Sequence, residues 1–488
     1  MPRRSRPLMD ACLSMTGLMA ERCQGFVDDM NSQEMNTGTR TRALKEKDKL
    51  AREASARMLM ANLYQQWKVD PKSTVGVMRT KNWYSGRREE IGPNITCRGV
   101  TSFLDYLSGR HLFEIVSEGR KHPDAREGIP TQVRAKQGLI DYLEQGDVSS
   151  FDLSRTYPPI ILKASRAEGK KPLRLERNEV TEKLEAGVNQ INKLLLNRWA
   201  DLAIPDADMA KLREEGINLP SRLYTHRTVY RVFNNGSFDQ GGRFYGGWWQ
   251  QIPSRLRQHI TINGMPTVEM DYSALHPRLI YAERGIQYEG DPYDVGLDES
   301  LRPLVKVTFQ KLINGVGYPR HPRPGSDEPP FDPDDIGMSW REFVERVKDC
   351  HSSISDLFGT GIGLRLQRKD SDIAQAVMLE FNDFGAVMLP VHDSFIVSGL
   401  DLGFLQLAMD QSMEKHSGIR VPIKIKENDQ ALPNMNPELA KHWDEYDSYN
   451  PAAERHVEPR LTGQFVDGYS AYQERVGQAV RQHHELTF

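Results

Sequence analysis

The sequence predicts an α+β protein in which a helical first part is followed by strands that end in acidic residues. Residues 1–72 hold charged runs with a helical character, such as RTRALKEKDKLAREASARM. Further along, PTVEMD alternates apolar and polar residues, as a strand with one buried face does, and Asp271 stands at its end. A second apolar strand meets a tight turn at His392-Asp393, and a third apolar strand returns from it. These patterns indicate helices together with at least one β-hairpin.

The bulk composition fits a protein of several domains. A length of 488 residues suggests two to four domains at roughly 100–200 residues each. No run approaches the ~20 apolar residues of a membrane helix, and the basic start has no clean apolar core of a signal peptide. Four cysteines lie far apart without metal spacing, which fits a reducing cytoplasm. We therefore expect a cytoplasmic protein without membrane segments. The net charge of −3 neither supports nor excludes a nucleic-acid partner.

Residues 73–148 follow the order of a winged helix. A strand-like TVGVM precedes a helical stretch with one apolar face, formed by Val100, Phe103, Leu104, Leu107 and Leu112. An apolar strand, a Gly/Pro/charge-rich turn over 118–130 and the extended piece TQVRAKQGLI follow. A winged helix would place its helix in the major groove of DNA. The alternative is a small α+β unit that only packs on its neighbours.

Residues 149–260 form a predicted connector with a thumb-like part. The strand in PPIILKAS precedes a long helix, VTEKLEAGVNQINKLLLNRWADL. The stretch from residue 222 to residue 259 then interleaves arginines with aromatic residues, a combination that holds phosphates and stacks bases. A charged surface over an aromatic core explains the same stretch equally well. Residues 261–430 carry the chemistry, with a Pro/Asp-rich insertion at 319–335, and residues 431–488 form a polar extension.

Two carboxylates at strand ends indicate a site for divalent metal ions. A charge at the end of an apolar strand is costly unless it is paired or bound to a metal. Asp271 and Asp393 are far apart in the sequence, yet both can converge on two Mg²⁺ ions, the arrangement that phosphoryl transfer uses. Mn²⁺ is the alternative metal. Each aspartate alone is explained as well by a turn.

The helix LRPLVKVTFQKLINGVGY places Arg302 and Lys306 on one face. Two cations at this spacing can bind the triphosphate of a nucleotide. A solvated basic face is the alternative. The apolar side of the same helix, with Leu304, Val305 and Phe309, indicates that it packs on a core.

These segments resemble, in content and order, the motifs of the DNA polymerase I family (family A). DYSALHPR resembles the first palm motif, Arg302 and Lys306 the fingers-helix motif, and VHDSF the second palm motif. The resemblance implies a right-hand polymerase fold, with an antiparallel palm sheet, helical fingers and a partial thumb. It also implies that Asp271 and Asp393 are metal ligands and that Lys306 protonates the pyrophosphate.

Three weaker matches extend the resemblance over residues 225–430. They are DQGGR with QQIP, then QRKDSDIAQAVM, then MEKHSGIRVPIKIK. By this resemblance, the side chains that contact the primer-template are those of Arg243, Gln250, Arg278, Gln367, Arg368 and His392. Those around the incoming nucleotide, besides Arg302 and Lys306, are those of Tyr272, His276, Gln310 and Asn314.

Several positions depart from the family pattern. His276 stands where the DNA polymerases have a glutamate that helps exclude the ribose 2′-hydroxyl, and Gln310 and Asn314 replace an aromatic residue and a tyrosine. Ser394 replaces the glutamate after the catalytic aspartate, as in phage-type single-subunit RNA polymerases. The choice between deoxyribose and ribose substrates therefore stays open.

The sequence as a whole predicts a DNA-directed DNA polymerase without a proofreading exonuclease. Its partners would be a primed DNA template and nucleoside triphosphates, and its cofactor two Mg²⁺ ions. Two alternatives remain. One is a single-subunit RNA polymerase or primase-polymerase, and the other is a catalytically inactive winged-helix DNA-binding protein on a polymerase scaffold.

Overall fold

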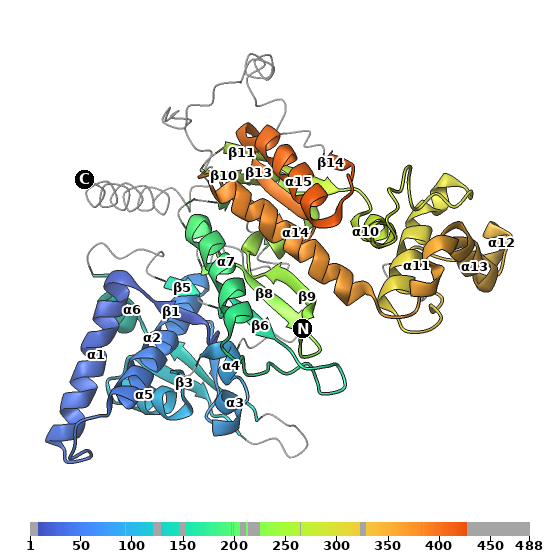
Figure 1. Cartoon of the computed structure of the whole chain (residues 1–488). Helices are drawn as coiled ribbons and strands as arrows, with labels where there is room; N and C mark the ends of the chain where they lie inside the picture. Colours follow the sequence, from blue (N-terminus) through green and yellow to red (C-terminus); the bar gives the residue numbers. More distant parts are fainter. Residues whose placement is uncertain are drawn as a thin grey trace.

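The computed structural model has a mixed α+β fold, as Figure 1 shows. Its buried hydrophobic residues form two cores. It describes residues 8–92, 94–120, 128–145, 153–155, 157–196, 198, 200–204, 211–212, 225–263, 265–322, 328–383 and 385–426. One core is formed by residues 9–153 and the other by residues 160–421. The α+β class is thereby confirmed. Among the described helices, none is long and apolar enough to cross a bilayer.

The N-terminal unit combines helices with a small antiparallel sheet. Its helices are α1 (Gly17–Asn36), α2 (Glu46–Val69), α3 (Lys81–Ser85), α4 (Arg88–Ile91), α5 (Cys97–Gly109) and α6 (Gln137–Leu143). Strands β2 (Val75–Val77), β3 (Phe113–Ser117) and β4 (Thr131–Ala135) pair in the order β2-β4-β3. Strand β1 (Leu13–Met15) pairs with β5 (Leu153–Arg155). The order helix, strand, turn, strand over α5, β3 and β4 is the one that the sequence predicts.

Helix α5 buries the apolar face expected from its sequence. Val100, Phe103, Leu104 and Leu107 are fully buried, whereas Leu112 lies beyond the helix end and is partly buried. Gly99 lets α5 approach α2 closely, because a Cβ atom there would lie 2.4 Å from Ser55 Oγ. The predicted boundary between residues 72 and 73 thus falls inside one continuous core.

The C-terminal unit is built on a six-stranded antiparallel sheet. Along the path β12-β13-β11-β10-β7, the strands are β12 (Met388–Val391), β13 (Ser394–Ser398), β11 (Met265–Tyr272), β10 (Ile260–Ile262) and β7 (Ala200–Leu202). Strand β14 (Ile423–Lys426) also pairs with β11. A separate three-stranded sheet joins β6 (Ile160–Leu162), β8 (Tyr230–Asn234) and β9 (Ser237–Tyr245).

Helices pack around these two sheets. They are α7 (Glu179–Leu196), α10 (Leu275–Glu283), α11 (Arg302–Asn314), α12 (Pro333–Ile336), α13 (Trp340–Cys350), α14 (Gly363–Asp383) and α15 (Leu402–Ser417). Figure 1 shows α11, α12 and α13 grouped at one end of α14, with the large sheet and α15 near its other end.

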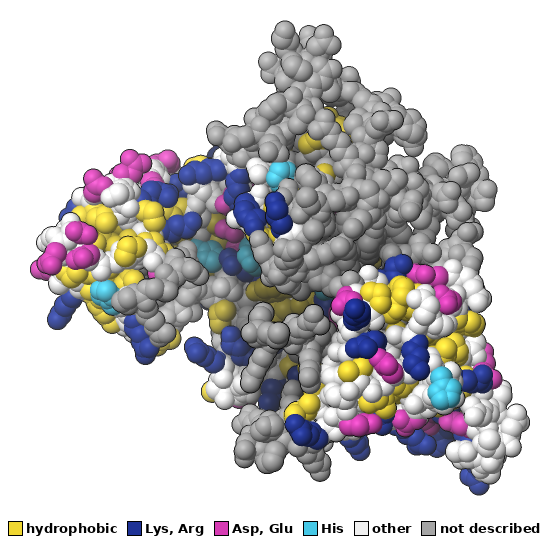
Figure 2. Space-filling view, turned by 180° about the vertical axis from the view of Figure 1, so that it is seen from behind, with side chains coloured by type: hydrophobic (Ala, Val, Ile, Leu, Met, Phe, Trp, Pro, Cys, Tyr) yellow, Lys and Arg dark blue, Asp and Glu magenta, His cyan; other side chains and the backbone are white. Residues whose placement is uncertain are grey.

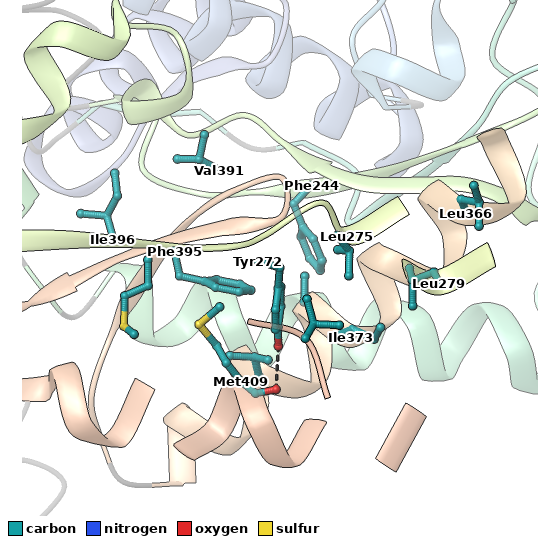
Figure 3. Packing of buried hydrophobic residues seen from close by; sticks show 14 of the residues in the cluster. Phe244, Tyr272, Leu275, Leu279, Leu366, Ile373, Val391, Phe395, Ile396 and Met409 are labelled. Atoms are coloured by element: carbon teal, nitrogen blue, oxygen red, sulfur yellow. Dashed lines mark hydrogen bonds between the residues drawn. The ribbon is translucent and has the colours of Figure 1, made fainter. Parts of the chain in front are cut away.

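One face of β11 belongs to the core and the other does not. Tyr272 and Phe395 lie with Met409 of α15 in the buried cluster of Figure 3, and the Tyr272 hydroxyl donates to Met409 O at 2.7 Å. Because strand residues alternate between faces, Glu269 and Asp271 lie on the opposite face. Strand alternation therefore separates the acidic positions of β11 from its core positions.

Three segments differ from the sequence-based expectation. The helix expected through NRWADL ends at Leu196, and Ala200–Leu202 form β7 because they pair with β10, which a local pattern cannot indicate. In TQVRAKQGLI only the first five residues are a strand. The rest begins α6, whose Leu139 and Ile140 are buried. The Pro/Asp-rich insertion holds the start of the short helix α12, and the predicted extension over 431–488 lies outside the described residues.

Candidate active site

Adjacent strands bring Asp271 and Asp393 together. In the antiparallel pair β11–β13, Asp271 stands opposite Ser394, and Asp393 is the preceding residue in the turn between β12 and β13. Burial, followed by the negative charge of Asp393, raises the pKa of Asp271 to about 6. Two carboxylates that oppose each other's ionisation in this way are a place where a cation is favourable.

Unusual backbone conformations flank the acid pair. His392, directly before Asp393, has φ 60°, and Ala274, three residues after Asp271, has φ 52°. Non-glycine residues in this left-handed region are uncommon and cluster at functional sites. The turn geometry thus sets the position of each carboxylate.

The acid pair has the donor chemistry of a magnesium site. Oδ1 of Asp271 is buried and has no hydrogen-bond partner among the residues that the structure describes. Mg²⁺ prefers oxygen ligands and is commonly held by one or two carboxylates together with water and substrate phosphates. No group of three or more His, Cys, Asp or Glu side chains in the described part of the chain could hold a metal by itself. The residues present therefore fit a metal that is completed by substrate and water.

Glu269 is a third acid beside the pair, and the motifs did not single it out. Its Oε1 accepts from Ser394 Oγ at 2.6 Å and from Lys426 Nζ at 2.5 Å, and Arg257 Nη1 lies 3.7 Å away. Glu269 is two residues before Asp271, so the alternation of the strand already places both on one face. Because its charge is compensated, Glu269 acts as an anchor for Ser394 next to Asp393.

Helix α11 presents a cation toward the acid pair. Lys306 is exposed, and its charge is one of those that lower the pKa of Asp271 against the stronger effects of burial and Asp393. Arg302, one turn earlier, forms an ion pair with Asp291, and its guanidinium lies 5.2 Å from the centre of the Tyr293 ring. The charge of Lys306 therefore acts on Asp271, whereas Arg302 is held by Asp291.

Gln310 and Asn314 continue the same side of α11. Asn314 Nδ2 donates to the backbone oxygen of Gln310 at 2.9 Å and to its Oε1 at 3.1 Å. Gly363 starts α14 against this point, since a Cβ atom there would lie 1.9 Å from Asn314 Oδ1. These two residues lie along the helix beyond Lys306 and are tied to each other.

Two predicted nucleotide-binding residues point elsewhere. The ring of Tyr272 is in the core, on the face opposite Asp271. His276 is buried, with Nε2 2.7 Å from Asp370 Oδ2 and 3.2 Å from Arg243 Nη2. The structure does not bring the Tyr272 side chain to the acids, and it ties His276 into a network with α14.

The same network includes Arg243, the arginine of the DQGGR segment. Asp370 accepts from Arg243 Nε at 3.1 Å as well as interacting with His276. Although burial opposes it, the Asp370 carboxylate raises the pKa of Arg243. Arg231 is fully buried and donates to Gly242 O, Ser371 Oγ and Asp372 Oδ1 at 2.6, 2.7 and 2.9 Å. Burial lowers the pKa of Arg231 to about 10, but the residue stays charged at neutral pH. These arginines hold β8 and β9 onto α14.

The QQIP segment supports β12, the strand that leads to Asp393. Gln250 Nε2 donates to Phe244 O at 3.0 Å and to Pro390 O at 2.9 Å, and Trp249 Nε1 donates to Pro390 O at 3.0 Å. Since Pro390 is in β12, both side chains fix the approach to His392 and Asp393. Gln250 thus serves as a support for the turn.

The remaining predicted nucleic-acid contacts divide into two groups. Arg278 is buried and donates to Ser273 O and Gly290 O, and Arg368 donates to Asp372 and to Phe238 O, so both bind the protein itself. Gln367 is half-buried on α14, and no hydrogen bond of its amide is found within the described ranges. His392 lies edge-on to Tyr245 at 5.8 Å between ring centres. Burial, then the charge of Arg243, lowers the pKa of His392, so its imidazole is neutral at pH 7.

Comparisons with known proteins find a structural likeness to a DNA polymerase domain, at low similarity. No protein-family model and no curated protein sequence matches this chain. Among solved structures, the POL domain of Pol1 from M. smegmatis, in complex with DNA primer-template and dNTP, aligns with a TM-score of 0.31 and 14% sequence identity. The alignment covers 45% of this chain and 51% of that one, so this chain spans about half the length of the structure it matches. A TM-score this low carries no argument about activity, which depends here on the side chains.

Proposed function

We propose that this chain is a template-directed nucleotidyltransferase of the right-hand polymerase type. More narrowly, we propose a DNA-directed DNA polymerase of the polymerase I type without a proofreading exonuclease. The observation that carries the proposal is the acid pair of β11 and the β12–β13 turn, with the charge of Lys306 acting on it. The proposed palm is the large antiparallel sheet, and the proposed fingers are α11 to α13.

The acid pair would hold two divalent ions with Asp271 and Asp393 as ligands. When bound, Mg²⁺ activates the 3′-hydroxyl of the primer and stabilises charge on the leaving pyrophosphate. For this role Asp271 must be ionised. With a pKa of about 6, most of its carboxyl is ionised at pH 7 and above. Lys306 would neutralise the triphosphate and supply a proton to the pyrophosphate.

Arg302 and His392 would have different tasks in the same reaction. Arg302 would exchange Asp291 for a phosphate oxygen, because an exposed ion pair is weak enough to be replaced. The neutral imidazole of His392, supported by Tyr245, would contact the primer end beside Asp393. Both tasks place groups around the proposed metal site without further rearrangement of the sheet.

Two alternatives are separated by particular residues. A single-subunit RNA polymerase or primase-polymerase is favoured by Ser394, which bonds to Glu269, and by His276, whose ring is held by Asp370. A catalytically inactive DNA-binding protein would have no use for a buried, unpartnered carboxylate oxygen such as Asp271 Oδ1. Burying such a group costs stability, which a scaffold used only for grip could recover by substitution.

The N-terminal unit is proposed to be a winged-helix DNA-binding module. The proposal is supported by α5, which exposes Arg98 near its start, and by the antiparallel pair of β3 and β4 that follows it. Residues 1–72 would belong to the same module, because α1 and α2 share its core. The module would hold the template while residues 261–430 carry out synthesis and residues 149–260 connect the two.

Nucleotide incorporation tests the proposed function. Purified protein would be given dNTPs or rNTPs on primed and on unprimed templates, with Mg²⁺ and with Mn²⁺. We expect primer extension with dNTPs that disappears in Asp393→Asn and persists in Asp401→Asn, which changes another partly buried aspartate outside the site. Products made from rNTPs without a primer would support the RNA polymerase alternative. No product under any condition would support the inactive binding protein.

A further inference from the structure

A compact hairpin follows β6 and projects beside the turn between β8 and β9. Lys163 pairs with Pro172 across it, Ala164 N donates to Lys171 O at 2.8 Å, and Leu173 N donates to Leu162 O at 2.7 Å. Its turn is closed by Lys170 N, which donates to Ser165 O at 3.0 Å. We call residues 163–177 the cationic hairpin; in Figure 1 it is part of the segment between β6 and α7. The backbone bonds make it an ordered structure.

The cationic hairpin carries a concentration of unpaired positive charge. Its exposed cations are Arg166, Lys170, Lys171, Arg174 and Arg177. Over the part of the chain that the structure describes, none of these five side chains forms an ion pair. The hairpin also holds two acids. Glu168 accepts a hydrogen bond from Ser165 Oγ at 2.7 Å, so Glu176 is the acid that remains to offset the five cations. Like charges held this close repel each other unless an anionic partner compensates them.

Strand β9 connects the cationic hairpin with the acid pair. Lys163 N donates to Phe233 O and Gly236 N donates to Lys163 O, both at 2.9 Å, so the hairpin is fixed to the end of β8 and to the turn that leads into β9. At the other end of β9, Tyr245 lies against His392, the neighbour of Asp393. β9 is paired along its whole length with the five residues of β8, so its two ends lie only roughly 13 Å apart. One strand therefore connects the exposed cations with the candidate active site.

This length corresponds to a stretch of nucleic-acid duplex. At 3.4 Å per base pair, roughly 13 Å is about four base pairs. Figure 2 shows that Lys and Arg side chains also gather in the middle of the face opposite to that of Figure 1, between the α11–α13 part and the N-terminal unit. A polyanion of regular charge spacing is the partner that a row of exposed, unpaired cations at this distance fits best.

We propose that the cationic hairpin binds the phosphodiester backbone of the duplex about four base pairs behind the primer end. The proposal rests on the proposed function for the position of the primer end. The hairpin would bind without reading sequence, since contacts to phosphates carry no base information. It would add affinity for duplexes long enough to reach it and leave the reaction at the acid pair unchanged.

The salt dependence of DNA binding tests whether the cationic hairpin contacts phosphates. The variant carries Arg166→Gln, Lys170→Gln, Lys171→Gln and Arg174→Gln. A matched control carries Lys193→Gln, Arg284→Gln, Lys415→Gln and Arg420→Gln, four exposed cations on α7 and near the ends of α10 and α15. Binding of a 20-base-pair primed DNA is measured by fluorescence anisotropy over a range of salt. Each lost phosphate contact lowers the slope of log K against log salt by about 0.9, so the hairpin variant should lose about 2 to 4 from its slope. The control should keep the wild-type slope, and an unchanged slope in the hairpin variant would overturn the proposal.

A duplex-length series tests the distance. Wild-type affinity should rise when the duplex behind the primer end grows from two to eight base pairs, and this rise should be lost in the hairpin variant. The same rise in both proteins would contradict the proposal. Circular dichroism and thermal unfolding confirm that the variant is folded, which is expected because all four side chains are exposed.

The outcome is separable from that of the proposed function. Salt-dependent binding that needs the hairpin, without any nucleotide incorporation, supports the surface and rejects the polymerase proposal. Primer extension with an unchanged salt slope in the hairpin variant does the opposite. Hairpin-dependent binding of polyglutamate or of phosphatidylserine vesicles, with none of DNA, would assign the surface to another anionic partner and overturn the inference.

Discussion

The two arginine-rich parts of the small β6-β8-β9 sheet use positive charge in opposite ways. Where β8 and β9 meet α14, Arg231 and Arg243 are bonded to Asp370, Asp372 and Ser371. At the other end, the cations of the hairpin are exposed and unpaired within the described ranges. The first group holds two elements together and the second is available for a partner. An arginine in a motif therefore indicates a binding residue only when its guanidinium is free of internal partners.

The buried network also has an electrostatic effect on the site. The charge of Arg243 lowers the pKa of His392, and the charge of Asp393 raises the pKa of Arg243. Burying charges is unfavourable unless they are paired and hydrogen-bonded, as Arg243 and Arg231 are. The network thus fixes β9 next to the second acid, while the hairpin extends from the far end of the same strand.

Removing the shared acceptor of the buried network should have the largest effect. Asp370→Ala leaves the partly buried Arg243 and the buried His276 without their carboxylate, and we expect a loss of about 3–5 kcal/mol in the free energy of unfolding. Urea denaturation measures it. Lys170→Ala on the hairpin serves as the exposed control. A loss under about 1 kcal/mol for Asp370→Ala would mean that the network does not hold the fold.

The close approach at Gly242 should have the next largest effect. Gly242 has φ 83°, and a Cβ atom there would lie 2.9 Å from both Arg231 Nη2 and Ser371 Oγ. Gly285 has φ 69° with nothing within 4 Å, so Gly285→Ala isolates the cost of the left-handed backbone, about 1–2 kcal/mol. Gly242→Ala should cost at least about 1 kcal/mol more, because overpacking adds to that strain. Equal losses of stability in Gly242→Ala and Gly285→Ala would show that the side chains around Gly242 move aside at little cost.

The acid pair should make the free energy of unfolding depend on pH. The pKa of Asp271 is about 6 in the folded chain, above the ~3.9 of an unfolded one, so the folded state binds the proton more tightly. Stability is therefore lost as pH rises from about 4 through about 6. Asp271→Asn should remove up to about 2 kcal/mol of this loss, raising stability at pH 8 and changing it little at pH 4. Thermal unfolding across this pH range measures it, and a variant that parallels wild type would contradict the shift.

Exposed hairpin residues should have the smallest effect on stability. Lys170→Gln and Arg174→Gln each remove a charge without an internal partner, so we expect changes within about 0.5 kcal/mol. Urea denaturation of both variants tests this. A loss above about 1.5 kcal/mol would mean that the hairpin cations stabilise the fold, and the contrast with Asp370 would fail.

Local periodicity accounts for what the sequence could predict. The buried face of α5, strand β11, the turn at His392-Asp393 and helix α11 all follow from spacing within one segment. The partners of Arg243 and Arg278 did not follow, because Asp370 and the Gly290 carbonyl belong to other elements. Strand β7 was missed for the same reason, since only its pairing with β10 distinguishes it from the end of a helix. Glu269 could have been recognised from strand alternation alone.

Metal binding tests the central claim most directly. Mn²⁺ binding at pH 7.5 would be measured by isothermal titration for wild type, Asp271→Asn, Asp393→Asn and the partly buried control Asp401→Asn. We expect each substitution in the acid pair to weaken binding at least tenfold, about 1.4 kcal/mol, and the control to bind as wild type does. If the Asp271 and Asp393 variants bind Mn²⁺ as tightly as wild type, the acid pair is not a metal site and the proposed reaction loses its basis.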